Sequence, residues 1–182
     1  SNTDLDSVLE RLSKIHNCYH MKFQMKGFSG KKNYKGEWTE PPTHLGTIDI
    51  VRDVIKKGYE SFAVIMNTDV RTGGGLHWYA LFCDFRTDPS TCEFFNSSGN
   101  KPMTEVQEWL IKTKNNINSS KIKRAKIVIL SGLVHQKDSE TECGPYSLYY
   151  IWNRLNGIPP EKFLEKRIPD SKMIKFRAMC WK

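Results

Sequence analysis

The sequence lacks any apolar run near the roughly 18 residues that a membrane-spanning helix needs, and no signal-peptide pattern opens it. We therefore expect no membrane contact. Cysteine is scarce, with 5 residues among 182, and no two of them have the Cys-Xaa-Xaa-Cys spacing of a zinc ribbon or redox motif. The odd number argues against a disulfide framework and favours reduced thiols in a cytosol-like compartment. We expect neither a metal ion nor another cofactor.

Acidic residues are outnumbered, 20 against 28 lysines and arginines, which gives a net charge of +8. The lysines between residues 22 and 35 have no acid among them, and a second basic cluster covers residues 121–126. Such surfaces face solvent or attract a polyanion, either nucleic acid or an acidic protein face. No RNP-type or zinc-finger pattern supports base readout. Charge alone therefore predicts at most a weak nucleic-acid contact.

Hydrophobic periodicity predicts one domain over residues 1–182, in the α+β class. A small central sheet flanked by helices is expected, after an irregular region over residues 16–46. The expected helices cover residues 4–15, 47–57, 104–114, 160–167 and 170–179, together with the stretch that follows residue 143. The expected strands cover residues 62–67, 76–85, 92–96 and 126–130.

A polar loop runs into an aromatic helix within residues 135–157, and Cys143 stands where that helix begins. Pro145 fits the first helical turn, where its missing N–H is not needed. The helix dipole and the unpaired N–H groups favour a thiolate there, and such thiols have pKa values roughly 1–5 units below the ordinary value of about 8.5. The alternative is a small buried apolar residue, as most free cysteines are.

Two polar residues on neighbouring predicted strands complete a set typical of cysteine proteases. His77 opens one strand, and Asn96 ends the next. If these strands pair, the two side chains meet at one edge of the sheet. A cysteine protease needs a thiolate, an imidazole that moves the proton, and a group that orients the imidazole. Taken singly, the histidine is more often a surface or core residue, and the asparagine more often a turn former.

His77-Trp78, the run from Phe95 to Asn100 and the run from Thr141 to Leu148 together resemble the adenain/SUMO-protease clan. The order His, Asn, Cys is that of the clan. Within it, the sequence is most similar to virion-maturation, polyprotein-processing proteases of large cytoplasmic DNA viruses such as African swine fever virus. The resemblance implies a core with a small central mixed sheet flanked by helices.

The resemblance implies that His77 is the general base, Asn96 orients its imidazole, and Cys143 is the nucleophile. It also implies an oxyanion-binding glutamine about six residues before the cysteine. Gln136 stands seven before it, and the backbone N–H of Cys143 is a second donor. Trp78 is implied to narrow the substrate channel so that only Gly-Gly passes before the scissile bond. The fallback groups for orienting the imidazole are Asp84, Asp88 and Asp138.

The predicted function is a cysteine endopeptidase that cleaves after Gly-Gly-type sites in viral structural polyproteins, in the host cytoplasm and virion. One alternative is an isopeptidase that removes ubiquitin or a SUMO-like modifier. Another is a catalytically inactive module that binds Gly-Gly tails. Residues 59–182 are expected to form the catalytic core, and residues 1–58 a helix and an irregular arm on the substrate side.

Overall fold

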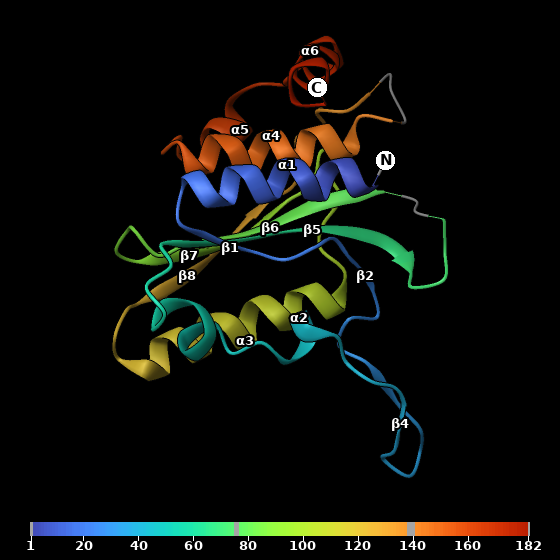
Figure 1. Ribbon diagram of the computed structural model, residues 1–182, viewed down its shortest axis with the longest axis vertical. Coiled ribbons are helices and arrows are strands. Elements are labelled where there is room, and N and C mark those ends of the chain that lie inside the picture. The colour runs from blue at the N-terminus through green and yellow to red at the C-terminus, as the bar shows by residue number, and fades with distance from the viewer. Residues whose placement is uncertain (1, 75–76, 138–140, 182) are drawn as a thin grey trace.

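A central mixed sheet lies between two layers of helices (Figure 1). The computed structural model describes residues 2–74, 77–137 and 141–181. The strand order is β1-β5-β6-β7-β8, with β2 beside β5. β5, β6 and β7 are antiparallel, β1 and β2 run parallel to β5, and β8 runs parallel to β7. The strands are β1 Cys18–His20, β2 Gln24–Lys26, β5 Ser61–Val70, β6 Trp78–Asp84, β7 Ser90–Phe95 and β8 Ala125–Leu130.

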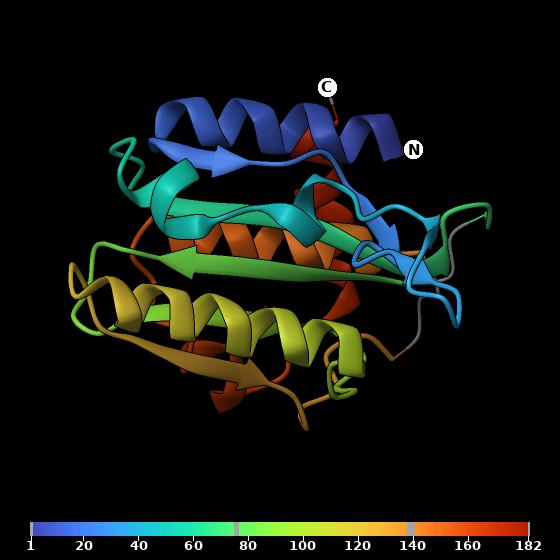
Figure 2. The same ribbon diagram turned by 90° about the horizontal axis from the view of Figure 1, so that it is seen from below.

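Helices cover both faces of the sheet (Figures 1 and 2). One layer holds α1 Asn2–Ile15, α4 Cys143–Leu155, α5 Lys162–Glu165 and α6 Asp170–Cys180. The other holds α2 His44–Thr47, the π-helical turn η1 Val51–Ile55 and α3 Thr104–Ser120. In the described residues, every helix is too short or too polar to cross a membrane.

The strand sequences build a core on each face, because successive side chains of a strand point to opposite sides. In β5, Phe62 and Val64 pack with α2, η1 and α3, whereas Ala63 and Ile65 pack with α1, α4 and α6. Strands buried on both faces read as continuous apolar runs. This is why the central strands were predictable from sequence.

The predicted helix over residues 47–57 is shorter in the structure, where Thr47 ends α2 and only Val51–Ile55 form a helical segment before Gly58. Asp49 interrupts it, because its carboxylate accepts the Arg52 N–H at 2.9 Å, while the Asp53 carboxylate accepts the Asp49 N–H at 2.9 Å. These bonds cap a new helical turn and leave Ile48 extended. Short acidic side chains compete in this way with a continuing helix.

Two further helices differ in length from the prediction. α3 continues six residues beyond Lys114, because buried Ile117 extends the apolar stripe of Val106 and Leu110. Lys121, in a left-handed conformation, then ends it. α5 is a single turn, shorter than the predicted residues 160–167.

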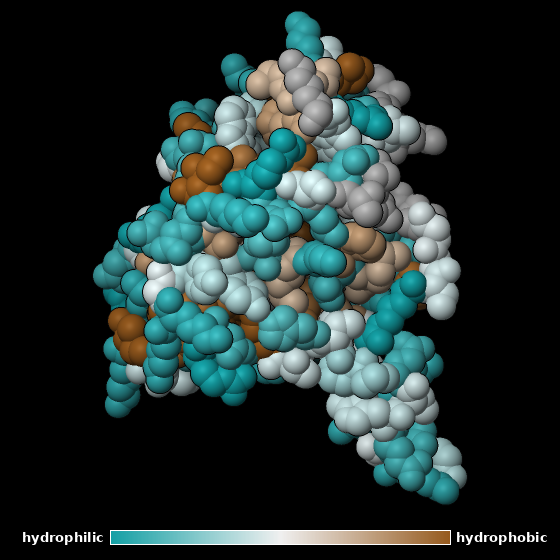
Figure 3. Space-filling model, in the orientation of Figure 1, coloured by the Kyte–Doolittle hydropathy of each residue, from teal (hydrophilic) through white to brown (hydrophobic). Residues whose placement is uncertain are grey.

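A two-stranded hairpin projects from the body of the protein (Figures 1 and 3). It consists of β3 Lys31–Lys32 and β4 Trp38–Glu40, paired antiparallel. We call residues 30–40 the hairpin arm. It lies in the region for which the sequence predicted an irregular arm.

The last residue of β6, the middle of β7 and the last turn of α4 meet in a buried ion cluster. Arg154 of α4 donates from Nε and Nη2 to the two carboxylate oxygens of Glu93, at 2.8 and 2.9 Å. Its Nη2 also donates to Asp84 at 3.0 Å. Arg86 pairs with Asp84 at 2.9 Å and donates to the last carbonyls of α4. Two arginines thus balance two carboxylates, which satisfies the condition for burying such charges.

Candidate active site

Two strand ends and one helix start meet at one edge of the sheet. The antiparallel register places the start of β6 beside the end of β7. His77 directly precedes β6, and Asn96 directly follows β7. Cys143 is the first residue of α4, which packs on β6. The predicted pairing of the two strands is confirmed.

The His77 imidazole is hydrogen-bonded to the Asn96 side chain. Nε2 of His77 lies 2.6 Å from Oδ1 of Asn96. The same oxygen accepts the backbone N–H of Ser98 at 3.0 Å and the Ser98 hydroxyl at 2.8 Å. An amide oxygen only accepts, so the proton of the His77–Asn96 bond belongs to Nε2. Nδ1 is then the ring nitrogen that can take up a further proton.

The Cys143 sulfur lies against the chain that carries His77. The backbone N–H groups of Trp78, Gly144 and Cys143 itself favour the charged form of the sulfur and act to lower its pKa. Burial nevertheless raises the pKa of the Cys143 thiol above its ordinary value, and Glu142 acts in the same direction. The sequence left open a thiolate with a lowered pKa and a small buried residue, and the direction of the pKa shift agrees with the second. Desolvation of the charged sulfur outweighs the N–H groups at the helix start.

The raised pKa of Cys143 predicts how its reactivity depends on pH when His77 is removed. Because burial raises the pKa of the Cys143 thiol, less of it is ionised at a given pH than in an exposed cysteine. In a His77→Ala variant, alkylation of Cys143 by iodoacetamide should rise with pH, with a midpoint above the ordinary value of about 8.5. Peptide mass spectrometry separates Cys143 from the other cysteines. A midpoint below pH 7.5 would show that the N–H groups dominate instead.

Gln136 is held beside the same strand end. Its backbone N–H donates to the Ser97 carbonyl at 3.0 Å, and the Ser97 hydroxyl donates to Gln136 Oε1 at 2.9 Å. The carbonyl end of the amide is thus fixed by the residue after Asn96. Nε2 is the end of the side chain that can donate to an oxyanion.

Trp78 is half-buried between the sheet and the residues that start α4. Its ring meets Phe23 edge-on, with centroids 5.4 Å apart. Beside it lies a cavity of about 170 Å³. Its walls come from α1, the start of β6, α4 and the loop before it, and α6 with the residue after it. They are Leu5, Trp78, Thr141, Gly144, Pro145, Arg177 and Trp181.

Neither of the two fallback orienting groups that the structure describes, Asp84 and Asp88, lies beside the imidazole. Asp84 lies at the opposite end of β6, in the ion cluster with Arg86 and Arg154. Asp88 pairs with Arg124 on the surface. Asp138 lies outside the described residues.

Sequence reasoning missed three of the residues around the site. Ser98 shares the Asn96 oxygen, and the Asn-Ser-Ser-Gly turn was the available signal. Phe23 comes from the irregular region, and Trp181 from the far end of the chain. Neither lies in a motif, so only the fold brings them to Trp78.

Comparison with known proteins gives a family for the chain. Residues 9–180 match the family described as Ulp1 protease family, C-terminal catalytic domain. Two relatives from African swine fever virus are named cysteine protease S273R and SUMO-1 cysteine protease S273R. Each is 35% identical to this chain over an alignment of 192 residues, which covers 98% of this chain. The chain spans 66% of the length of these relatives.

Solved structures agree with this match. The selenomethionine crystal structure of African swine fever virus pS273R protease superposes with a TM-score of 0.76 and 30% identity, covering all of this chain and 67% of the other. The yeast Ulp1 protease domain, solved in complex with the SUMO ortholog Smt3, has a TM-score of 0.61 over all of this chain and 74% of its own. Because its sequence is only 14% identical, this likeness shows a shared fold and nothing more. The predicted fold class, a central mixed sheet flanked by helices, and the predicted likeness to SUMO proteases are both confirmed, and the chain belongs to the Ulp1 protease family.

Proposed function

We propose that the chain is a cysteine endopeptidase that cleaves after Gly-Gly-type sites in viral structural polyproteins. The observation that carries this proposal is the contact of His77 Nε2 with Asn96 Oδ1, at the edge of the sheet where Cys143 begins α4. Family membership supports thiol-dependent peptide hydrolysis. The likeness to a viral cysteine protease supports a viral substrate, and with it a place in the host cytoplasm and virion.

In the proposed reaction, His77 Nδ1 takes the proton of the Cys143 thiol as the sulfur attacks the scissile carbonyl. The imidazolium then gives its proton to the leaving amine, and a thioester remains on Cys143. His77 next removes a proton from the water that hydrolyses this thioester. Asn96 keeps the ring aligned through both halves but supplies no charge.

The developing oxyanion is proposed to receive two hydrogen bonds, from the Cys143 backbone N–H and from Gln136 Nε2. Gln136→Ala should lower kcat by about 10²–10³ and change KM little, because these bonds strengthen only in the transition state. Steady-state kinetics on a Gly-Gly peptide measure this. Gln136→Glu is the matched variant. It keeps the acceptor for Ser97 and removes the donor, so equal activity in Gln136→Glu and wild type would exclude this role.

Specificity for Gly-Gly is proposed to come from Trp78. A channel bounded by this ring admits residues without side chains, which is a steric form of selection. A peptide with Ala-Ala before the scissile bond should lose at least about 10² in kcat/KM relative to its Gly-Gly counterpart. In the Trp78→Ala variant, the difference in kcat/KM between the Gly-Gly and Ala-Ala peptides should be smaller than in wild type. Equal turnover of both peptides by the wild type would remove the Gly-Gly assignment.

A second candidate is an isopeptidase that releases ubiquitin or a SUMO-like modifier. It is favoured by the relative named SUMO-1 cysteine protease and by the fold shared with Ulp1, which was solved with Smt3. C-terminal fluorogenic derivatives of ubiquitin and SUMO, assayed beside Gly-Gly-Xaa peptides, separate the two. Turnover of the modifiers alone would reject the polyprotein function. Turnover of neither, with folding intact, would favour an inactive Gly-Gly-binding module.

A further inference from the structure

The hairpin arm is the most exposed part of the chain, and it is basic and aromatic. Tyr34 is 92% exposed and Trp38 51% exposed. The arm itself contains three lysines and two glutamates, a net charge of +1, and with the segment that leads into it, residues 22–40 contain five lysines and two glutamates, a net charge of +3. In the part of the chain that the structure describes, Lys26, Lys31, Lys32 and Lys35 form no ion pair.

Two of these lysines are held against the exposed rings. Lys32 Nζ lies 4.5 Å from the centre of the Trp38 ring, and Lys35 Nζ lies 5.6 Å from that of Tyr34. Contact with an aromatic face restrains a lysine that is otherwise flexible. An anionic partner therefore meets ammonium groups that are already partly ordered, which lowers the entropic cost of binding.

The base of the arm is held to the body by packing and hydrogen bonds, whereas the tip is exposed to solvent. Phe28 is buried in the core beside α3. The Glu105 carboxylate accepts the N–H groups of Gly27 and Ser29, at 2.9 and 2.8 Å. Arg71 donates to the carbonyls of Gly27 and Pro41, at 2.6 and 2.8 Å. Arm and body therefore form one rigid unit at this point.

Arg71 also places the arm at the end of the sheet that carries the candidate active site. It directly follows β5, whose last residue, Val70, pairs with Lys26 of β2. Two residues before Val70, Thr68 donates its backbone N–H to the His77 carbonyl at 2.9 Å. Figures 1 and 2 both show the arm leaving the body at this end. When the scissile bond of a protein substrate lies at Cys143, other segments of that substrate can therefore reach the arm.

We propose that the hairpin arm is a docking site for an acidic segment of the protein substrate, away from the cleavage site. This rests on the proposed function and adds a class of substrate to it. The positive arm is complementary to a run of aspartate and glutamate. Nucleic acid fits less well, because lysines already lie over both exposed rings on which bases would stack.

Two pairs of peptides with the same Gly-Gly site test the proposal. Each continues through a Gly/Ser linker of about 12 residues, with a root-mean-square reach of roughly 20 Å, to about six glutamates or six glutamines. The linker and tail are placed on either side of the site in separate peptides. At low salt, the glutamate tail should raise kcat/KM about tenfold on one side. Since these charges are exposed, 0.5 M NaCl should remove most of the gain.

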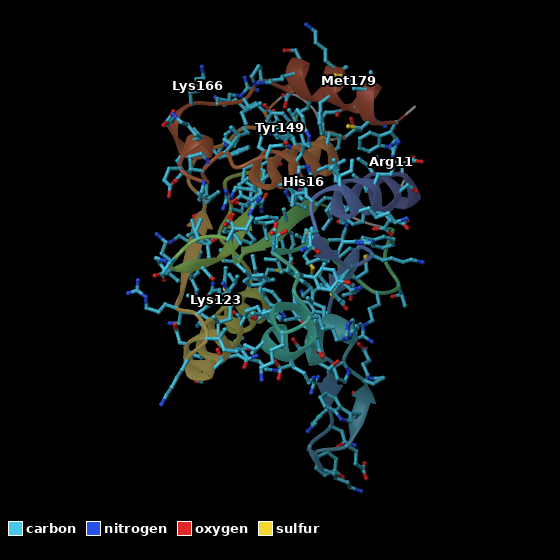
Figure 4. All side chains as sticks on the ribbon, turned by 60° about the vertical axis from the view of Figure 1, so that its left-hand side comes forward. Arg11, His16, Lys123, Tyr149, Lys166 and Met179 are labelled. Carbon is cyan, nitrogen blue, oxygen red and sulfur yellow. The ribbon has the colours of Figure 1, made fainter. Side chains whose placement is uncertain are left out.

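A triple variant, Lys31→Gln with Lys32→Gln and Lys35→Gln, should lose this gain in kcat/KM. It should keep wild-type activity on the glutamine-tailed peptide. The matched control neutralises Lys121, Lys123 and Lys126, three lysines near the α3–β8 connection. Lys123 lies across the molecule from the arm (Figure 4). The control should keep the gain. Equal turnover of both tails, or equal loss in both triple variants, would overturn the proposal.

Binding without turnover separates this proposal from the proposed function. Fluorescence polarisation of a labelled glutamate-tailed peptide should show arm-dependent binding in the Cys143→Ser variant, whether or not wild type cleaves Gly-Gly. A labelled oligothymidylate of about 20 nucleotides is the competing probe. If the oligonucleotide binds through the arm lysines and the glutamate tail does not, the arm is a nucleic-acid site and the proposal is wrong.

Discussion

Cys143→Ser should lower kcat/KM on a Gly-Gly peptide by roughly 10⁴–10⁶-fold, the range found when the nucleophile of a triad is removed. A serine hydroxyl is less acidic and less nucleophilic than the thiol, and nothing else in the described site supplies the attacking atom. The free energy of unfolding should change by about 1 kcal/mol or less, because the substitution replaces one small atom at a buried helix start.

Thermal or urea unfolding, measured beside kinetics, separates the nucleophilic role from a structural one. Cys180→Ser is the matched control, because Cys180 is another free cysteine, on α6. It should keep full activity. A Cys143→Ser protein that fails to fold, or that retains a tenth of wild-type activity, would contradict the role assigned to Cys143.

Arg154→Met should have the largest effect on stability, a loss of about 3–5 kcal/mol. The substitution leaves the Glu93 carboxylate fully buried without its cation, and removes one of two cations from Asp84. Tyr150 still donates to Glu93, at 2.5 Å, but a neutral donor does not compensate the charge. Urea denaturation at constant pH measures the loss.

Arg124→Met is the control for this prediction. Arg124 forms an ion pair with Asp88 in which both side chains are about three-quarters exposed, at 74% and 73%. Exposed pairs of this kind contribute about 0–1 kcal/mol. Adding Glu93→Gln to Arg154→Met should recover part of the loss, because the uncompensated charge is then gone. A loss below 1 kcal/mol in Arg154→Met would show that the cluster does not hold the structure together.

The ion cluster also explains why α4 is well placed to present a cysteine. Its first residue faces the strand ends with His77 and Asn96, and its last turn is tied to β6 and β7 by Arg154 and Arg86. The same three elements are therefore joined at both ends. The helix cannot slide along the sheet without breaking buried charge pairs.

The parts of the site on regular elements were predictable from sequence. His77, Asn96 and Cys143 each stand at the boundary of an apolar run, and such boundaries are visible in the spacing of the residues. The apolar character of β5, β6 and β7 follows from burial on both faces, which leaves a clear signal.

What could not be predicted depends on contacts between distant segments. The direction of the Cys143 pKa is set by burial, and burial comes from the packing of α1, β6 and α6 around α4. The break at Asp49 is decided by a side chain that caps one turn at the expense of a longer helix. The pairing of Phe23 with Trp78 joins residues that share no motif.

Covalent labelling tests the central claim most directly. A peptide aldehyde or vinyl sulfone that ends in Gly-Gly should modify Cys143 with one equivalent, as located by peptide mass spectrometry. His77→Ala should slow this labelling by at least about 10², the usual effect of removing a general base, while Cys180→Ser should leave it unchanged. Labelling of another cysteine, or equal labelling in wild type and His77→Ala, would contradict an imidazole-assisted sulfur at the start of α4.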